Sequence, residues 1–430
     1  MPSPLEFSSA DLSPEAQLLL CCARTQMDAA NAERITTLLQ KNIEWNYLLE
    51  MAFCHNLAPL LYQSLEGLAP TTIPESARAA LKEQIQVDIQ GNLFLTKELV
   101  HLLALFNQHG LPVLPYKGPV LAASVYHDLA LRPFNDLDIL VHEQDIMQAL
   151  DLLVSCGYEI IRPPSVAQVR KSLQLRSIKH LVEKSSGAYQ LVLWHPDRQV
   201  VVELHWRITP KYVLKNSPEQ LWEDVIPVTL AGVTVLSFAP EDLLWFLCVH
   251  GAKHQWMRLN WLCDIAELIR VYPTLDWEQV ASRAAELGIE RRLYLGLLLA
   301  NYLLKTPLPK AIETKIHTTP HVKILAQQVM EQIFGDTEQT SGFPSFEQFA
   351  FQLRAMDRMA DRGRYLFHFA MRMETATTAD ETFLKPISFP YLFSYLLRPL
   401  RLAKTYGLRP LGSLIKIAIV SLLGVDKTEL

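Results

Sequence analysis

The sequence predicts an α+β fold, in which a small mixed β-sheet with flanking helices is embedded between an N-terminal helical domain and a large C-terminal helical domain. Two observations lead to this prediction. Short runs of alternating polar and apolar residues, typical of strands, are confined to the middle of the chain. Longer runs with apolar residues at helical spacing precede and follow them. We therefore expect an N-terminal helical domain at 1–108, an α/β core at 109–238 and a C-terminal helical domain at 239–430.

The first hundred residues carry helix signals and no reactive cluster of side chains. Ser13 followed by Pro14 predicts a helix start, because serine caps the free N–H groups and proline is tolerated at the first helical position. A second, much longer helical run extends from Ser76 to Gln108 and ends before Gly110. We expect this region to pack against the central sheet.

The central region contains two acidic residues on one strand. A strand at 111–114 leads into a Lys-Gly turn, a short helix follows, and a second strand in the stretch 134–141 carries Asp136 and Asp138. Alternate residues of a strand point to the same face, so both carboxylates should project together while Leu137 and Ile139 enter the core. Two converging carboxylates favour a hard cation between them, and Mg²⁺ binds carboxylate and phosphate oxygens. The pattern predicts a metal site for phosphoryl or nucleotidyl transfer; a turn residue followed by a solvated edge strand is the alternative for an Asp-x-Asp taken alone.

A third acidic residue lies on a Val-rich strand at 199–207, which should pair with 189–194 across the turn-forming segment 195–198. Glu203 and His205 share one face of this strand. A partly buried glutamate needs a partner. A metal shared with the two aspartates would provide one, and an ion pair with an arginine or lysine on the sheet is the alternative.

These residues resemble the core of the DNA polymerase β-type nucleotidyltransferase superfamily, and more narrowly its bacterial branch of uncharacterised nucleotidyltransferases. The superfamily pattern is a Gly-Gly or Gly-Ser turn, an Asp-x-Asp/Glu strand and a third acidic strand. Here Lys117-Gly118 replaces the usual turn, and the segment from Gly118 to Asp136 is longer than in the minimal fold. The resemblance to the superfamily core covers about 100–210, and the resemblance to the narrower branch extends through His250 to Asp264.

The resemblance implies an Mg²⁺-dependent nucleotidyltransferase that moves a nucleoside monophosphate, with AMP as the first expectation, from a nucleoside triphosphate to an acceptor and releases pyrophosphate. It implies that Asp136, Asp138 and Glu203 hold two Mg²⁺ ions, for which Mn²⁺ could substitute. Nucleotide contacts are implied for a further set of residues: Lys117 and Arg132 at the leaving group, Gly118 by close backbone approach, and His205, which would orient the acceptor or Glu203. The acceptor, a small molecule, a peptide or a protein, is not identified. An inactive scaffold with the same fold, in a biosynthetic cluster, is the alternative function.

A second polar stretch follows at 250–264. His250 and His254 have the i, i+4 spacing of zinc ligands, but no glutamate stands between them and no third ligand is apparent, so we do not expect zinc. In the resembled branch this segment is a signature that follows the catalytic domain. It implies a wall over the nucleotide, with Lys253, His254 and Arg258 contacting the nucleotide and Trp256 or Trp261 near the base. A buried structural network is the alternative.

The composition of the sequence limits which binding partners and which cell compartment we expect. The formal net charge of −5 gives no reason to expect nucleic acid. The six cysteines lack metal-ligand spacing and are expected to be buried free thiols in a reducing compartment. Without a signal-peptide pattern or an apolar run of ~20 residues, we expect a cytoplasmic protein.

A mixed basic and apolar tail at 389–424 is expected to dock on the body, with peripheral contact to a membrane surface as the alternative. Four basic residues are expected to form a solvated face, with phosphate contact as the alternative: Lys171, Arg176, Lys179 and His180.

Overall fold

The computed structural model describes residues 12–162, 189–211, 213–214, 220–335 and 346–372. The chain divides into two compact units, 1–341 and 342–430. The described part of the second unit consists of two helices, α17 (Phe346–Arg354) and α18 (Met359–Arg372). Both boundaries of the expected three-domain division fall inside the first unit, so that division stays a prediction. The basic cluster around 171–180 and the tail at 389–424 lie outside the described residues.

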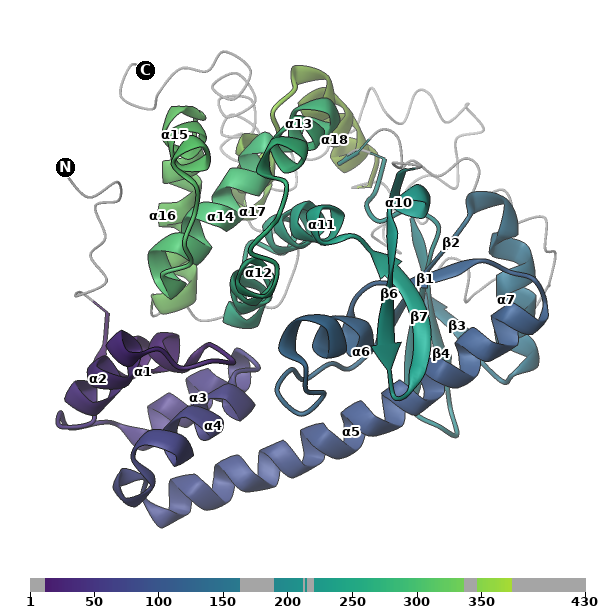
Figure 1. The fold of residues 1–430 in the computed structure, drawn as a ribbon. Coiled ribbons are helices and arrows are strands. Elements are labelled where there is room, and N and C mark those ends of the chain that lie inside the picture. Colours follow the sequence, from purple (N-terminus) through teal and green to yellow (C-terminus); the bar gives the residue numbers. More distant parts are fainter. Residues whose placement is uncertain (1–11, 163–188, 212, 215–219, 336–345, 373–430) are drawn as a thin grey trace, which may run out of the picture. The chain divides into compact units, whose positions relative to one another are not determined.

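The described part of the chain begins with a group of short helices and continues into one long helix, α5 (Figure 1). Ser13 caps the first of them, and its hydroxyl accepts a hydrogen bond from the N–H of Ala16 at 3.2 Å, as the Ser-Pro signal predicts. Helix α5 has 34 residues, which gives a length of ~51 Å. It therefore extends from the short helices to the sheet. These elements are α1 (Pro14–Cys22), α2 (Ala29–Leu38), α3 (Trp45–Cys54), α4 (Ala58–Leu68), η2 (Pro70–Thr72) and α5 (Glu75–Gln108).

A mixed five-stranded sheet follows, with the strand order β1-β2-β5-β4-β3. Strands β2 and β5 pair in parallel, whereas the other neighbours are antiparallel. The first strand begins two residues later than expected, because the N–H of Leu111 still bonds to the carbonyl of Phe106 at the end of α5. The elements of this part are β1 (Val113–Pro115), α6 (Gly118–Leu121), η3 (Ala122–Tyr126), β2 (Leu137–Val141), η4 (Glu143–Asp145), α7 (Ile146–Ser155), β3 (Glu159–Arg162), β4 (Gln190–His195) and β5 (Val200–His205).

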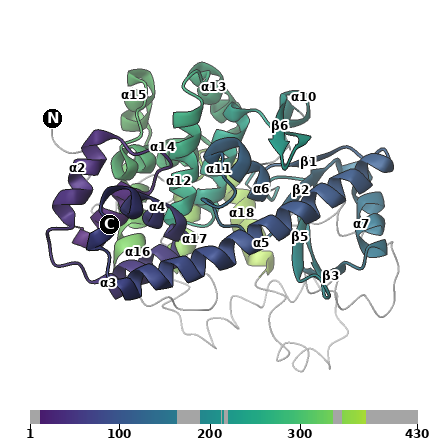
Figure 2. The ribbon, with the colours of Figure 1, turned by 60° about the horizontal axis from the view of Figure 1, so that its bottom comes forward.

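The alternating strand residues form the core on one face of the sheet. Leu137 and Ile139 of β2 and Val202 and Leu204 of β5 are completely buried, together with apolar residues of α5 and α7. Figure 2 shows α5 running along the sheet and α7 at its end. The opposite face of β2 and β5 carries the polar residues, as the alternation predicts.

A two-stranded hairpin and a group of helices complete the first unit. Helix α14 is buried along nearly its whole length, as its apolar sequence predicts. Among the described residues, no helix is both long and apolar enough to cross a membrane. The elements are α10 (Gln220–Glu223), β6 (Val225–Leu230), β7 (Val233–Phe238), α11 (Pro240–Lys253), α12 (Leu259–Val271), α13 (Trp277–Leu287), α14 (Glu290–Leu304), α15 (Lys310–Thr318) and α16 (Val322–Phe334).

The cysteines are only partly as expected. All six are free thiols, and four of them are buried. Cys54 is exposed and Cys156 is partly exposed, so the expectation of six buried thiols was wrong for these two. Cys54 is the last residue of α3, and Cys156 follows the last residue of α7.

Candidate functional site

The polar face of the sheet opens into a cavity of about 420 Å³. Its walls come from the Lys-Gly turn after β1, the loop that leads into β2, strand β5, and helices α11 and α12. The cavity thus lies between the sheet and the helices that follow it in the sequence. The predicted site residues all line it: Lys117, Gly118, Arg132, Asp136, Asp138, Glu203, His205, Lys253, His254 and Arg258.

Parallel pairing of β2 and β5 places Asp138 directly beside Glu203. His205, two residues further along β5, lies on the same face. Its Nε2 is 3.1 Å from Oδ1 of Asp138 and 3.3 Å from Oε2 of Glu203. Ligand atoms of these three residues lie within 4.8 Å of one another, and this is the one group of three or more candidate metal ligands found among the described residues.

Asp136 precedes β2 by one residue and lines the same cavity, but it is not part of that tight group. Burial and the charge of Asp138 raise the pKa of the Asp136 carboxyl to about 6, against the opposing effect of Lys117. The Asp136 carboxyl therefore titrates in mildly acidic solution. A bound cation would lower this pKa again, because it favours the charged form.

Lys117 neutralises part of the acidic cluster. Its Nζ lies 2.8 Å from Oδ1 of Asp138. Burial lowers the pKa of Lys117, but the charges of Asp138, Asp136 and Glu203 outweigh that effect, and the pKa is raised overall. Burial alone would raise the pKa of Asp138. The charge of Lys117 and the hydrogen bond from His205 outweigh burial and bring the pKa of Asp138 below its usual range. Lysine and aspartate are therefore both charged at neutral pH.

Gly118 fits a position where a side chain would be strained. Its φ is +52°, and a Cβ at this residue would lie 3.2 Å from the carbonyl oxygen of Asp136. The turn after β1 can therefore pack directly against the start of β2. This close approach brings the ammonium of Lys117 to Asp138.

Helix α11 supplies the opposite wall. The rings of His250, His254 and Trp261 lie within 5.4 Å of one another, and Lys253 contacts the hydroxyl of Tyr189. Burial lowers the pKa of His254 to about 3 and that of His250 well below 6.5, so both imidazoles are neutral. Burial and the nearby Lys117 lower the pKa of Lys253 to about 8. This wall offers neutral rings and one titratable amine.

Trp256 does not line the cavity, although the sequence analysis placed it or Trp261 near a base. Its side chain is completely buried and packs over Gly251, where a Cβ would come within 2.2 Å of the ring. It also approaches Gly296 of α14. Trp261 does line the cavity. Gly251 therefore serves packing, since only a residue without a side chain leaves room for the indole.

Arg132 has a partner that the sequence analysis did not foresee. Its Nε donates to Oδ1 of Asp264 at 2.7 Å and its Nη2 donates to Oδ2 at 2.9 Å. The hydroxyl of Tyr126 donates to Oδ1 of Asp264 at 2.7 Å. Such a bidentate pair fixes the guanidinium in orientation. It joins the loop before β2 to α12, and a contact of Arg132 with phosphate stays a prediction.

Several cavity residues were missed because they look like ordinary core residues in the sequence. Tyr116, next to Lys117, is 1% exposed and its hydroxyl has no hydrogen-bond partner. Its ring centroid lies 5.7 Å from that of His205 and 5.0 Å from that of Phe246.

Further buried polar atoms without a partner belong to residues that line the cavity: Oδ2 of Asp138, Nδ1 of His205, Oγ1 of Thr209 and Oδ1 of Asn260. Buried polar atoms are normally hydrogen-bonded, so these atoms are available to a polar ligand in the cavity.

The donor set fits a divalent cation. Carboxylate oxygens are the ligands that Mg²⁺ and Mn²⁺ prefer. Asp138 keeps its second oxygen, Oδ2, without a protein partner, and Glu203 is 23% exposed at its side chain. The neighbouring Asp136 adds a third carboxylate to the same cavity.

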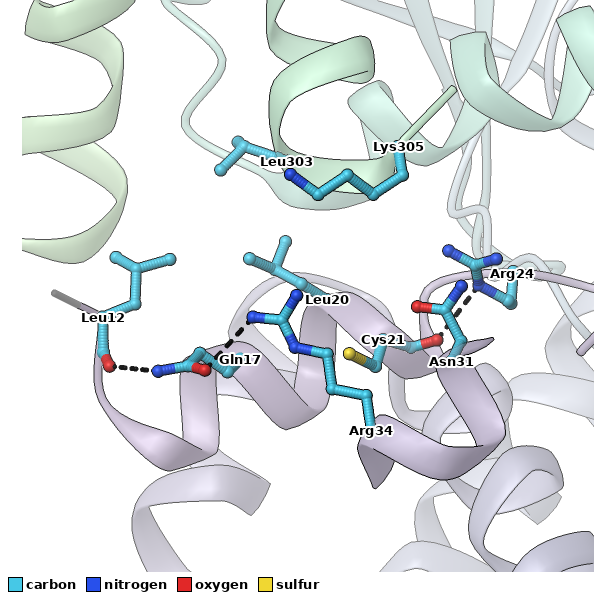
Figure 3. A pocket seen from close by; sticks show the side chains of 9 residues that line it. All are labelled: Leu12, Gln17, Leu20, Cys21, Arg24, Asn31, Arg34, Leu303 and Lys305. Carbon is cyan, nitrogen blue, oxygen red and sulfur yellow. Dashed lines mark hydrogen bonds between the residues drawn. The ribbon is translucent and has the colours of Figure 1, made fainter. Parts of the chain in front are cut away.

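A second, smaller cavity lies between the first helices and the end of α14 (Figure 3). It has a volume of about 20 Å³, close to that of one water molecule. The guanidinium of Arg24 is already bonded to the carbonyl oxygens of Cys21 and Leu304 and to Asp28. This cavity offers no group arranged for chemistry.

Comparison with known proteins agrees with this geometry. A family model described as "Uncharacterised nucleotidyltransferase" matches residues 41–305, a segment that includes every residue lining the large cavity. Searches of curated proteins and of solved structures gave no significant match. The match covers more than half of the chain, and the chain therefore belongs to this family of uncharacterised nucleotidyltransferases.

Proposed function

We propose that this protein is a divalent-cation-dependent enzyme that transfers a nucleoside monophosphate from a nucleoside triphosphate to an acceptor. One observation carries the proposal: β2 and β5 pair in parallel so that Asp138 stands beside Glu203, with Asp136 in the same cavity. Family membership supports the reaction class. AMP is the group we expect to be transferred.

Asp136, Asp138 and Glu203 would hold the cations, for which Mg²⁺ is the first expectation and Mn²⁺ a substitute. When bound, two such ions would neutralise phosphate charge and activate the acceptor oxygen. His205 bridges Asp138 and Glu203 and holds both carboxylates in one orientation. A ligand orientation fixed in this way reduces the cost of assembling the site.

The rest of the cavity would bind the nucleotide. Gly118 lets the backbone approach the phosphates, and Lys117 supplies positive charge beside them. Lys253, His254 and Arg258 would contact the nucleotide from the helical wall, with Trp261 against the base. Arg132 would add positive charge from the position in which Asp264 holds it.

In such a transfer an acceptor oxygen forms a bond to the α-phosphorus, the bond from the α-phosphorus to the bridging oxygen breaks, and pyrophosphate leaves. The acceptor proton passes to solvent. A small molecule, a peptide or a protein hydroxyl would each satisfy this chemistry, and the cavity is lined by polar and aromatic groups that suit any of them.

Calorimetry with Mn²⁺ and each nucleoside triphosphate tests the proposal without knowledge of the acceptor. The wild-type protein should bind at least one triphosphate in a Mn²⁺-dependent manner. Asp138→Asn should lose this binding and keep the circular dichroism spectrum of the wild type. The exposed Asp151→Asn on α7 is the matched control and should bind like the wild type. Equal Mn²⁺-dependent binding by Asp138→Asn would contradict the assignment of the cation site.

A further inference from the structure

The middle of α5 carries a buried asparagine. Asn92 is 1% exposed, although it lies between partly exposed and exposed residues in a 34-residue helix. Burying an amide is unfavourable unless the amide is hydrogen-bonded. The hydrogen-bond partners of the Asn92 side chain therefore show what its burial serves.

All of its side-chain partners lie in the loop between η3 and β2. The Nδ2 of Asn92 donates to the carbonyl of Leu129 at 2.6 Å and to the carbonyl of Arg132 at 3.1 Å. Its Oδ1 accepts from the N–H of Phe134 at 3.2 Å. One side chain thus satisfies three backbone groups that no strand or helix pairs.

The same loop carries two residues of the site. Arg132 is bound on its other side to Asp264 of α12. Asp136 follows Phe134 by two residues and leads directly into β2. The loop is therefore held between α5 and α12, with Asn92 as its anchor on the α5 side.

We propose that Asn92 is a positioning residue of the carboxylate centre: through three hydrogen bonds to the 129–134 loop it sets Asp136 and Arg132 relative to Asp138. The inference rests on the function proposed above and goes beyond it, because Asn92 lines neither the cavity nor the cation site. Residues that orient metal ligands contribute 10–100-fold to metal affinity in other proteins.

The test compares two substitutions one helical turn apart. Asn92→Asp keeps the shape of the side chain and removes the amide that donates to the carbonyls of Leu129 and Arg132. Thr96→Val is the matched control: Thr96 is 2% exposed and its hydroxyl donates only to the carbonyl of Asn92, within α5. Asn92→Ala removes the three bonds without adding charge and replaces Asn92→Asp if that variant does not fold.

Two quantities are measured: the affinity for Mn²⁺·ATP by calorimetry, and amide hydrogen exchange of peptides that cover 127–136. We expect Asn92→Asp to weaken Mn²⁺·ATP at least tenfold and to speed exchange in this loop, and Thr96→Val to change neither by more than twofold. If the wild type binds Mn²⁺·ATP, and Asn92→Asp and Thr96→Val bind it with equal affinity, the proposed role of Asn92 is overturned and the proposed function is not. A wild type that binds no Mn²⁺-nucleotide of any base would overturn the proposed function and this role with it.

Discussion

Lys117 and Asp138 show how single residues shape the site. The ammonium of Lys117 lies 2.8 Å from Oδ1 of Asp138, and His205 contacts the same oxygen at 3.1 Å. One oxygen of the carboxylate is thus shared by two protein donors, whereas the other has none. A cation that approaches Asp138 therefore meets an existing positive charge unless a nucleotide gives Lys117 another partner.

Lys117→Met should separate the effect of the ammonium on cation binding from its effect on nucleotide binding. Removing the ammonium leaves three carboxylates without their nearest lysine, so affinity for Mn²⁺ in the absence of nucleotide should rise roughly tenfold. Affinity for Mn²⁺·ATP should fall, because a positive charge at the phosphates is lost. Titration of Mn²⁺, followed by electron paramagnetic resonance, measures the first effect. Unchanged nucleotide-free Mn²⁺ affinity would contradict the account of Lys117, and Lys253→Met on the opposite wall should show a smaller increase.

Single residues also mark the limit of what the sequence predicts. Alternation along the strands was sufficient to place Glu203 and His205 on one face and Leu137 and Ile139 in the core. The pairing of Arg132 with Asp264 could not be predicted, since it joins residues 132 positions apart. Asn92 gave no signal either, because one asparagine in a long helical run looks like any solvated position.

At the scale of elements, the parallel pairing of β2 with β5 assembles the site. These strands are far apart in the sequence, and β3 and β4 lie between them along the chain. Periodicity predicts strands but not which strand neighbours which. The metal expected to be shared by Glu203 and the two aspartates required their strands to lie close together, and the structure adds the parallel pairing that places Asp138 beside Glu203. The hairpin of β6 and β7 was not predicted, although the sequence analysis assigned its residues to the α/β core.

Helix α11 provides a test of element packing. Gly251→Ala should destabilise the protein by about 1–3 kcal/mol, because the new Cβ would meet the ring of Trp256 at 2.2 Å. Gly91→Ala in α5 is the control: a Cβ there meets nothing within 4 Å, and alanine should stabilise the helix by about 0.4–1 kcal/mol. Urea denaturation measures both. Gly251→Ala with wild-type stability would show that Trp256 does not pack against α11 as described.

At the scale of the whole molecule, the buried histidines predict sensitivity to acid. Burial lowers the pKa of His55 to about 4, and its Nδ1 accepts a hydrogen bond from the N–H of Leu259 at 3.4 Å. Below pH ~6.5 the unfolded chain binds a proton that the folded protein does not, so the stability due to His55 is present above that pH and is lost as the pH falls toward 4.

His55→Gln isolates this contribution. Between pH 6 and 4.5 the wild-type free energy of unfolding should fall more steeply than that of the variant, by up to about 1.4 kcal/mol per pH unit. Urea denaturation at pH 7, 6, 5 and 4.5 measures the two slopes. Parallel slopes across this range would contradict a neutral, buried His55 in the folded protein.

The central claim concerns the whole molecule as an enzyme, and transfer of label tests it most directly. Wild-type protein is incubated with each α-³²P-labelled nucleoside triphosphate, Mg²⁺ or Mn²⁺ and a cell extract, beside Asp138→Asn and the Asp151→Asn control. We expect label to move onto an acceptor with the wild type and with Asp151→Asn, at a rate roughly 10²–10⁴-fold above that of Asp138→Asn. Transfer by Asp138→Asn at the wild-type rate would contradict the account.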